Sequence, residues 1–195
     1  MLLHKNRRLF ACLALVPALL AMTLALVSSR AGVAQTTDTA ARLHGQVEAI
    51  IAGKDSAERG AAITRQLEKL EVKVRTQPFE KQQRRGTNII AELLGAGSST
   101  SATRTLMIGA HYDRVAVGRG AVDNAASCAM LLELIPRLKK SPLKSFNVHV
   151  AFWDLEEGGL TGSQSFVDAA RADDDAGQKL PDAYINFDIF GYGDT

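Results

Sequence analysis

Apolar segments of strand length alternate with segments of helical periodicity along this chain, and this alternation is the feature that most limits its fold. Three apolar runs, 105–110, 147–153 and 183–187, are typical of strands. The segments between them, 125–139 and 162–172, have the apolar spacing of helices. Such alternation favours a largely parallel sheet covered by helices on both faces. The sequence therefore predicts an α/β fold, a three-layer α/β/α sandwich with a mostly parallel mixed sheet.

The region before these elements is expected to contain two helices followed by two strands. Apolar residues at helical spacing predict a helix over 39–52 and a second helix that starts at Asp55 or Ser56. Alternation of apolar and polar residues at 72–74 and the apolar run at 88–94 then predict two strands. Together with the later elements, these segments make one domain of ordinary size, which we place at 35–195.

The N-terminal segment 1–34 has the pattern of an export signal. A basic start at 4–8 is followed by an apolar run at 9–27, and small residues surround Ala31 and Ala34, where a signal peptidase could cut. The apolar run is almost long enough to span a bilayer. We therefore expect 1–34 to be a cleaved signal peptide and the protein to be exported, periplasmic or secreted. An uncleaved N-terminal membrane anchor is the alternative.

The charge balance argues against a nucleic-acid partner. The net charge of +2 comes from the segment 1–34, which holds basic side chains and no acidic one. Over 35–195 the acidic side chains outnumber the basic ones. A nucleic-acid binder is expected to show a basic patch in its folded part, and none is visible here. We expect no membrane contact either, unless the N-terminal segment stays uncleaved.

Some side chains with chemical potential are expected to be structural. Cys12 would leave with the signal peptide, so Cys128 would have no partner for an internal disulfide. Because Cys128 lies in an apolar helical stretch, it is predicted to be a buried structural thiol. His149 is predicted to be a packed or surface histidine, and Trp153 a core residue.

A histidine and several carboxylates follow the predicted strands. Carboxyl ends of parallel strands meet at one edge of a sheet, and active sites gather there. Carboxylates crowded together repel one another unless a positive charge lies among them. A divalent metal is the natural counter-charge, and histidine with carboxylates suits zinc. The residues expected at this edge are His111, Asp113, Asp123, Glu156, Glu157 and Asp188.

Four short stretches in this order resemble the co-catalytic zinc exopeptidases of peptidase family twenty-eight, the secreted aminopeptidases related to glutaminyl cyclases. The resemblance extends over about 88–191, and each stretch falls on the element it should occupy. The stretches are Gly109-Ala110-His111-Tyr112-Asp113, Val122-Asp123-Asn124-Ala125, Trp153-Asp154-Leu155-Glu156-Glu157-Gly158-Gly159-Leu160-Thr161-Gly162-Ser163 and Ile185-Asn186-Phe187-Asp188.

The resemblance implies two zinc ions and assigns their ligands. His111 and Asp188 would hold one zinc, Glu157 would hold the other, and Asp123 would bridge the pair. Asp113 would lie behind His111 and hydrogen-bond its ring, which fixes the tautomer and orientation of the imidazole.

The same resemblance implies a metalloaminopeptidase. Glu156 would be the general base that takes a proton from the attacking water and later passes it to the leaving amine. The substrates would be peptides with a free N-terminus, from which one N-terminal residue is removed.

One implied ligand has no counterpart in the sequence. The family supplies a further zinc-binding histidine downstream of the position of Asp188, and no histidine follows Asp188 in this sequence. The metal at Glu157 would then keep only Glu157 and Asp123, and the sheet would be incomplete at its C-terminal side. Two alternatives stay open: an inactive, truncated homologue that binds metal or peptide, and a glutaminyl-cyclase-like acyltransferase, which shares the fold and uses one zinc.

Overall fold

The computed structural model describes residues 38–95, 104–172 and 179–191. The signal or anchor predicted for 1–34 lies outside these residues. The chain divides into two units, Met1–Arg42 and Leu43–Thr195, and the features below belong to the second. A helix over 38–51 confirms the first predicted helix. Among the described helices, none has the length and apolar character needed to cross a membrane.

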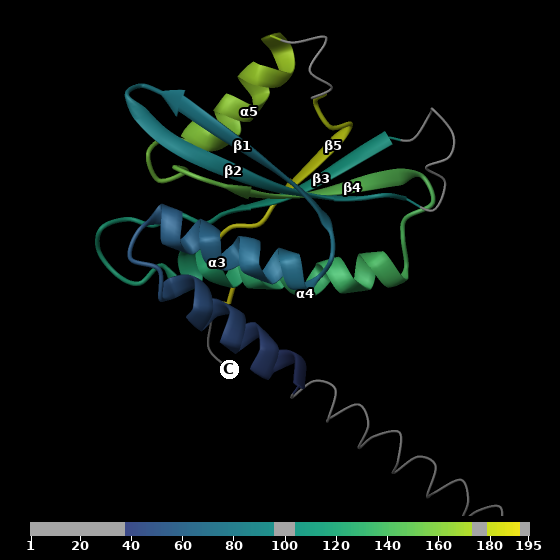
Figure 1. Ribbon diagram of the computed structural model, residues 1–195, viewed down its shortest axis with the longest axis horizontal. Coiled ribbons are helices and arrows are strands. Elements are labelled where there is room, and N and C mark those ends of the chain that lie inside the picture. Colours follow the sequence, from purple (N-terminus) through teal and green to yellow (C-terminus); the bar gives the residue numbers. More distant parts are fainter. Residues whose placement is uncertain (1–37, 96–103, 173–178, 192–195) are drawn as a thin grey trace, which may run out of the picture. The chain divides into compact units, whose positions relative to one another are not determined.

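A five-stranded mixed sheet forms the centre of the larger unit (Figure 1). Its spatial order is β1-β2-β4-β3-β5. β2 pairs antiparallel with both β1 and β4, whereas β3 pairs in parallel with β4 and β5. Four strands therefore run in one direction and β2 in the other, which confirms the mostly parallel mixed sheet. The strands are β1 (Lys73–Lys81), β2 (Arg84–Leu93), β3 (Arg104–His111), β4 (Phe146–Trp153) and β5 (Ala183–Asn186).

Helices cover both faces of the sheet and confirm the three layers. α3 (Ser56–Lys69) and α4 (Ala126–Lys140) lie on one face, and α5 (Thr161–Ala172) lies on the other (Figure 1). α3 begins where the sequence predicts, because the Asp55 side chain caps it by accepting a hydrogen bond from the backbone N–H of Glu58 at 2.9 Å.

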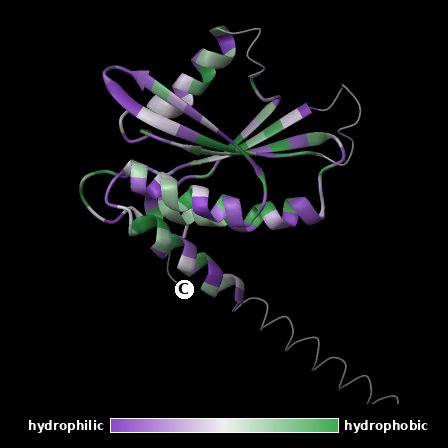
Figure 2. Cartoon of the chain, viewed as in Figure 1, coloured by the Kyte–Doolittle hydropathy of each residue, from purple (hydrophilic) through white to green (hydrophobic). Residues whose placement is uncertain are grey.

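Two apolar clusters join these layers, and strand periodicity separates them. Successive side chains of a strand point to opposite faces, so Val150 and Phe152 of β4 pack toward α3 and α4, whereas Ala151 and Trp153 pack toward α5. Trp153 meets the α5 residue Phe166 edge to face, with ring centroids 5.3 Å apart. The most hydrophobic strand segments lie at the centre of the sheet (Figure 2). The core position predicted for Trp153 is confirmed.

The β1–β2 hairpin is longer than the sequence predicts. The strands expected at 72–74 and 88–94 continue through the polar segment between them and turn at Gln82 and Gln83, whose φ angles are 53° and 63°. Two-residue hairpin turns need such positive φ values, and Asn or Gly usually supplies them. The turn is made of glutamines, and the β1 side chains next to it alternate between exposed and half-buried positions. The sequence of this part of the hairpin therefore contains no apolar pattern that would predict strands.

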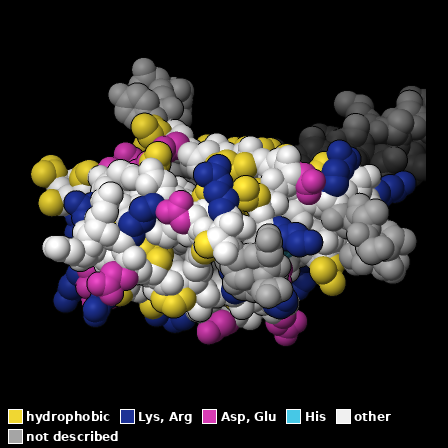
Figure 3. All heavy atoms as spheres, turned by 90° about the horizontal axis from the view of Figure 1, so that it is seen from above, with side chains coloured by type: hydrophobic (Ala, Val, Ile, Leu, Met, Phe, Trp, Pro, Cys, Tyr) yellow, Lys and Arg dark blue, Asp and Glu magenta, His cyan; other side chains and the backbone are white. Residues whose placement is uncertain are grey.

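The surface around β5 differs from the rest of the unit. All four residues of β5 are exposed. The exposed large apolar side chains in and around β5 are Leu180, Tyr184, Ile185, Ile189 and Phe190. Viewed from the α5 side, by contrast, acidic and basic side chains are interspersed with small apolar patches (Figure 3).

Candidate metal centre

His111 is the point on which the candidate site converges. It is the last residue of β3 and is 2% exposed. Its Nδ1 lies 3.3 Å from Oδ1 of Asp113. Its Nε2 faces three further carboxylates, at 3.0 Å from Asp123 Oδ1, 3.5 Å from Asp188 Oδ1 and 3.9 Å from Glu156 Oε2. Each ring nitrogen therefore has an acidic neighbour.

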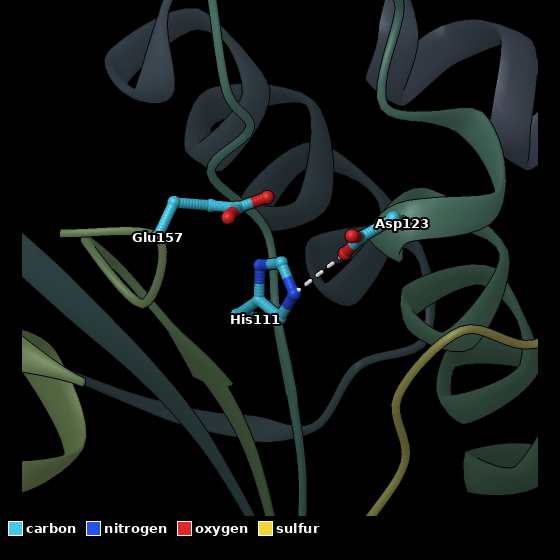
Figure 4. Close-up of side chains that lie close together, drawn as sticks. All are labelled: His111, Asp123 and Glu157. Carbon is cyan, nitrogen blue, oxygen red and sulfur yellow. Dashed lines mark ion pairs between the residues drawn. The ribbon is translucent and has the colours of Figure 1, made fainter. Parts of the chain in front are cut away.

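The sheet topology explains this convergence. β3, β4 and β5 are parallel, so their carboxyl ends share one edge, as predicted. Asp123 reaches the same edge from the turn Ala121–Ala125, which precedes α4. Ligand atoms of His111, Asp123 and Glu157 all lie within 4.8 Å of one another (Figure 4). The structure thus brings together the histidine and all of the carboxylates that the sequence singled out.

Asp113 joins the histidine to the glutamate pair. Its carboxylate is buried beside the imidazole of His111 and accepts hydrogen bonds from two successive backbone amides. Oδ1 accepts from Glu156 N at 3.0 Å, and Oδ2 accepts from Glu157 N at 3.1 Å. One side chain therefore lies against the ring and also holds the backbone that carries both glutamates. Groups that orient a metal ligand from behind act in this way.

The electrostatics of the cluster favour a cation. Burial alone lowers the pKa of His111, but Asp113 beside the ring and the charges of Glu156 and Asp188 raise that pKa to about 9. The pKa of Glu156 is raised by burial and by its acidic neighbours, although His111 opposes the shift. Burial and the charge of Asp123 likewise raise the pKa of Glu157. Carboxylates that repel one another are stabilised by a positive charge placed among them.

The donor set fits zinc. Oδ1 of Asp123 is buried and accepts no hydrogen bond from the described residues. Donor atoms around one tetrahedral zinc lie roughly 3.3–3.6 Å apart. The distances from His111 Nε2 to Asp123 and to Asp188, 3.0 and 3.5 Å, are close to that spacing. An imidazole with carboxylates is also a ligand set that zinc accepts.

The predicted structural role of Cys128 is confirmed by its surroundings. The thiol is fully buried on α4 and donates a hydrogen bond to the backbone carbonyl of His111 at 3.1 Å. Burial raises its pKa to about 12, with Asp113 adding to the shift and Arg59 opposing it. A thiol with such a pKa is not a nucleophile at neutral pH.

Two buried polar residues behind the site were missed by the sequence reasoning. Asn88 of β2 donates through Nδ2 to Gly162 O at 2.8 Å and accepts at Oδ1 from Asp154 N at 3.3 Å. It thereby joins the two ends of the segment that carries Glu156 and Glu157. The only indication of this role in the sequence was that Asn88, a polar residue, stands at the start of the apolar run 88–94.

Arg59 is the other missed residue. It lies on α3 and its side chain is fully buried. Arg59, Ile63 and Leu67 are spaced four residues apart, which places them on the same face of the helix. A charged residue on the buried stripe of a helix was the signal that could have found it.

Comparison with known proteins identifies the family. Residues 88–195, more than half of the chain, match Peptidase family M28. The chain belongs to peptidase family M28. "Probable lipoprotein aminopeptidase LpqL" of Mycobacterium tuberculosis is 38% identical over 102 residues, which are 52% of this chain and 19% of that protein. "Leupeptin-inactivating enzyme 1" of Streptomyces exfoliatus is 32% identical over 116 residues, 59% of this chain and 25% of that enzyme. The chain thus spans about a fifth to a quarter of the length of these curated relatives.

Solved structures support the M28 fold. The LapA aminopeptidase of Legionella pneumophila superposes with a TM-score of 0.62 at 16% identity, over 77% of this chain and 43% of that one. A glutaminyl cyclase of Porphyromonas gingivalis gives 0.60 at 21% identity, over 77% of this chain and 59% of that one. At such low identity the likeness establishes the fold alone.

Proposed function

We propose that this chain carries the metal centre of a zinc aminopeptidase, which removes N-terminal residues from peptides. The observation that carries the proposal is the set of carboxylates around Nε2 of His111 at the carboxyl edge of a parallel sheet. Membership of a peptidase family and relatives that are named aminopeptidases support it. An exported location is part of the proposal, on the basis of the basic and apolar pattern of residues 1–34.

The side chains divide into ligands and supports. His111 and Asp188 would hold one zinc, Glu157 would hold a second, and Asp123 would be shared between the two. Zinc bound there polarises the scissile carbonyl and lowers the pKa of water at the site. Asp113 keeps the ring of His111 turned so that Nε2 faces the carboxylates.

Glu156 acts as the general base. Its carboxylate lies 3.9 Å from His111 Nε2, at the edge of the ligand group. Burial and acidic neighbours raise the pKa of Glu156, which moves the carboxylate toward the neutral range, where a general base is most effective. It takes a proton from the attacking water and returns it to the amine that leaves.

The substrate is a peptide with a free N-terminus. Relatives that are named aminopeptidases support a substrate of this kind. A blocked N-terminus would leave no free amine for such an enzyme to recognise.

Zinc content and exopeptidase activity test the proposal together. Bound zinc is counted after dialysis of the native chain and of an Asp123→Ala variant, and hydrolysis is compared for leucine p-nitroanilide and its N-acetylated form. We expect zinc in the native chain and less zinc in the variant. We also expect the native chain to hydrolyse the free-amine substrate and not the acetylated one, and a chelator to abolish that hydrolysis.

Other results would overturn the proposal in identifiable ways. A folded native chain that binds no zinc removes the metal centre. Zinc without hydrolysis of either anilide favours an inactive binding homologue. Cyclisation of an N-terminal glutamine without anilide hydrolysis favours a glutaminyl-cyclase-like acyltransferase. Equal hydrolysis of the acetylated substrate excludes an exopeptidase that needs a free amine.

A further inference from the structure

Arg59 is a buried arginine whose hydrogen-bond acceptors are backbone carbonyls. Its Nε donates to the carbonyl of Tyr112, Nη1 donates to that of Arg119 at 3.1 Å, and Nη2 donates to that of Gly120 at 3.2 Å. The side chain belongs to α3 and is 0% exposed. Among the described residues, no carboxylate lies within ion-pair distance of its guanidinium.

Burying such a charge is costly, so its geometry needs an explanation. Desolvation lowers the pKa of Arg59, as expected for a buried cation, with Arg114 adding to the shift while Cys128 and Asp113 oppose it. A buried guanidinium without a carboxylate forgoes the attraction that offsets desolvation in a buried ion pair. What the side chain does offer is a rigid, planar fork of five N–H donors. Here that fork meets three carbonyls at once.

The three carbonyls mark the two ends of one loop, residues 112–120. Tyr112 directly follows His111, while Arg119 and Gly120 directly precede the turn Ala121–Ala125, which carries Asp123. One side chain on α3 therefore fixes the chain just after the first proposed ligand and just before the bridging one.

The middle of the same loop is held from another side. Arg114 donates through Nη1 to the carbonyls of Val115 and Gly118, at 2.9 and 3.1 Å, and through Nη2 to the carbonyl of Lys54 at 3.2 Å. These hydrogen bonds of Arg114 are exposed, whereas Arg59 is buried and reaches the loop ends. The two arginines thus hold different parts of the loop, and Arg59 holds the parts next to the ligands.

We propose that Arg59 is a positioning residue for the metal centre. By tying both ends of the 112–120 loop to α3, it sets the separation between His111 and Asp123 and so the affinity of the chain for zinc. This inference rests on the proposed function, because it assigns zinc to His111 and Asp123.

A purely structural role for Arg59 makes a different prediction. If the arginine only fills space between α3 and the sheet, its loss lowers stability but leaves the zinc affinity of the folded protein unchanged. Leu67 offers a matched comparison, since it is also fully buried on α3 and belongs to the apolar core. Leu67→Ala should therefore lower the melting temperature while zinc affinity stays native.

The experiment compares the native chain with Arg59→Met, Arg59→Lys and Leu67→Ala. Zinc affinity is measured by chelator competition at a temperature where circular dichroism shows each variant to be folded. Hydrogen exchange of the 112–120 amides is followed in zinc-free protein. We expect Arg59→Met to bind zinc roughly 10–100-fold more weakly and to exchange faster over 112–120. Arg59→Lys, which keeps the charge without the planar fork, should lose part of the affinity.

The outcomes separate this inference from the proposed function. A native chain that binds no zinc overturns the proposed metal centre and, with it, any role of Arg59 in zinc affinity. Native zinc binding with unchanged affinity in folded Arg59→Met overturns the inference alone, as does unchanged exchange over 112–120. If Arg59→Met does not fold, Arg59→Lys decides, and native affinity in that variant overturns the inference.

Discussion

Glu156 and Glu157 are neighbours in sequence, yet the proposed mechanism gives them different tasks. Both of their backbone amides donate to the carboxylate of Asp113, which holds the two residues in fixed positions. Glu157 then shares a ligand group with His111 and Asp123, while Glu156 lies at its edge. Removing the charge of Glu156 should therefore affect catalysis, whereas removing the charge of Glu157 should affect zinc binding.

Glu156→Gln should remove catalysis without removing metal. Loss of a general base costs roughly 10²–10⁴-fold in rate, while the proposed ligands His111, Asp123 and Asp188 stay in place. Steady-state hydrolysis of leucine p-nitroanilide and zinc content measure the two effects. Glu68→Gln, on the exposed side of α3, is the control and should match the native chain. Near-native turnover by Glu156→Gln would assign the base to another group.

His149 should make stability depend on pH, away from the metal centre. It lies on β4 opposite Glu92 of β2. Burial lowers the pKa of His149 below its usual value of 6.5; Glu92 opposes this shift, and Arg75 and Lys73 add to it. A histidine whose folded pKa is depressed contributes stability above the unfolded pKa, and that stability is lost as pH falls from 6.5 toward the folded pKa.

The free energy of unfolding of the native chain should therefore fall more steeply on acidification than that of His149→Gln. Urea denaturation at neutral pH and at a pH below 6.5 measures this difference. Titration of the other histidines is common to both proteins and cancels in the comparison. Equal pH slopes in the two proteins would show that His149 is not held in its neutral form.

The proposed metal ligands could be predicted from the sequence, whereas the residues that support them could not. His111 and Asp188 follow apolar strands, and parallel topology sends strand ends to one edge. Asn88 and Arg59 act through backbone groups of distant loops. Those contacts depend on how the elements pack, which neither residue's local sequence encodes.

The segment between β4 and α5 is closed by hydrogen bonds between its two ends. Gly162 N donates to the carbonyl of Asp154 at 3.1 Å, and Asn88 contacts both ends of the segment. A Cβ at Gly162 would collide with the Asp154 carbonyl oxygen and lie 2.5 Å from Oδ1 of Asn88. The start of α5 therefore requires glycine for space.

Gly162→Ala should destabilise the protein by about 1–3 kcal/mol, the usual cost of overpacking. Gly45→Ala is the matched control, because Gly45 lies in the helix over 38–51 and a Cβ there meets nothing within 4 Å. Since alanine favours helix by about 1 kcal/mol over glycine, Gly45→Ala should stabilise. Chemical denaturation measures the change in the free energy of unfolding for both variants. An unchanged free energy of unfolding in Gly162→Ala would mean that the segment between β4 and α5 can shift to make room for the methyl group.

The elements themselves were predictable wherever burial imposed a period on the sequence. β3, β4, α4 and α5 all appear within one residue of their predicted bounds. The outer part of the β1–β2 hairpin was not predicted, because its side chains alternate between exposed and half-buried positions. Apolar periodicity in a sequence reflects the burial of side chains, so an element that buries few side chains has no clear periodicity.

Among the described strands, β5 is the least protected. Among the described strands it pairs with β3 alone, and its four residues are exposed. Tyr184 and Ile185 point to opposite faces of the sheet, and they are 46% and 45% exposed. A strand edge with free backbone groups and apolar side chains is a template for pairing with another chain.

This chain should therefore self-associate as its concentration rises, and Ile185→Lys should weaken that association. A lysine on an edge strand opposes pairing through charge and hydration. Leu94→Lys is the control, because Leu94 is 72% exposed but lies outside β5. Sedimentation velocity over a concentration series measures the effect. Association that responds equally to both substitutions would reflect general apolar exposure, whereas association that Ile185→Lys leaves intact would exclude the β5 edge as its site.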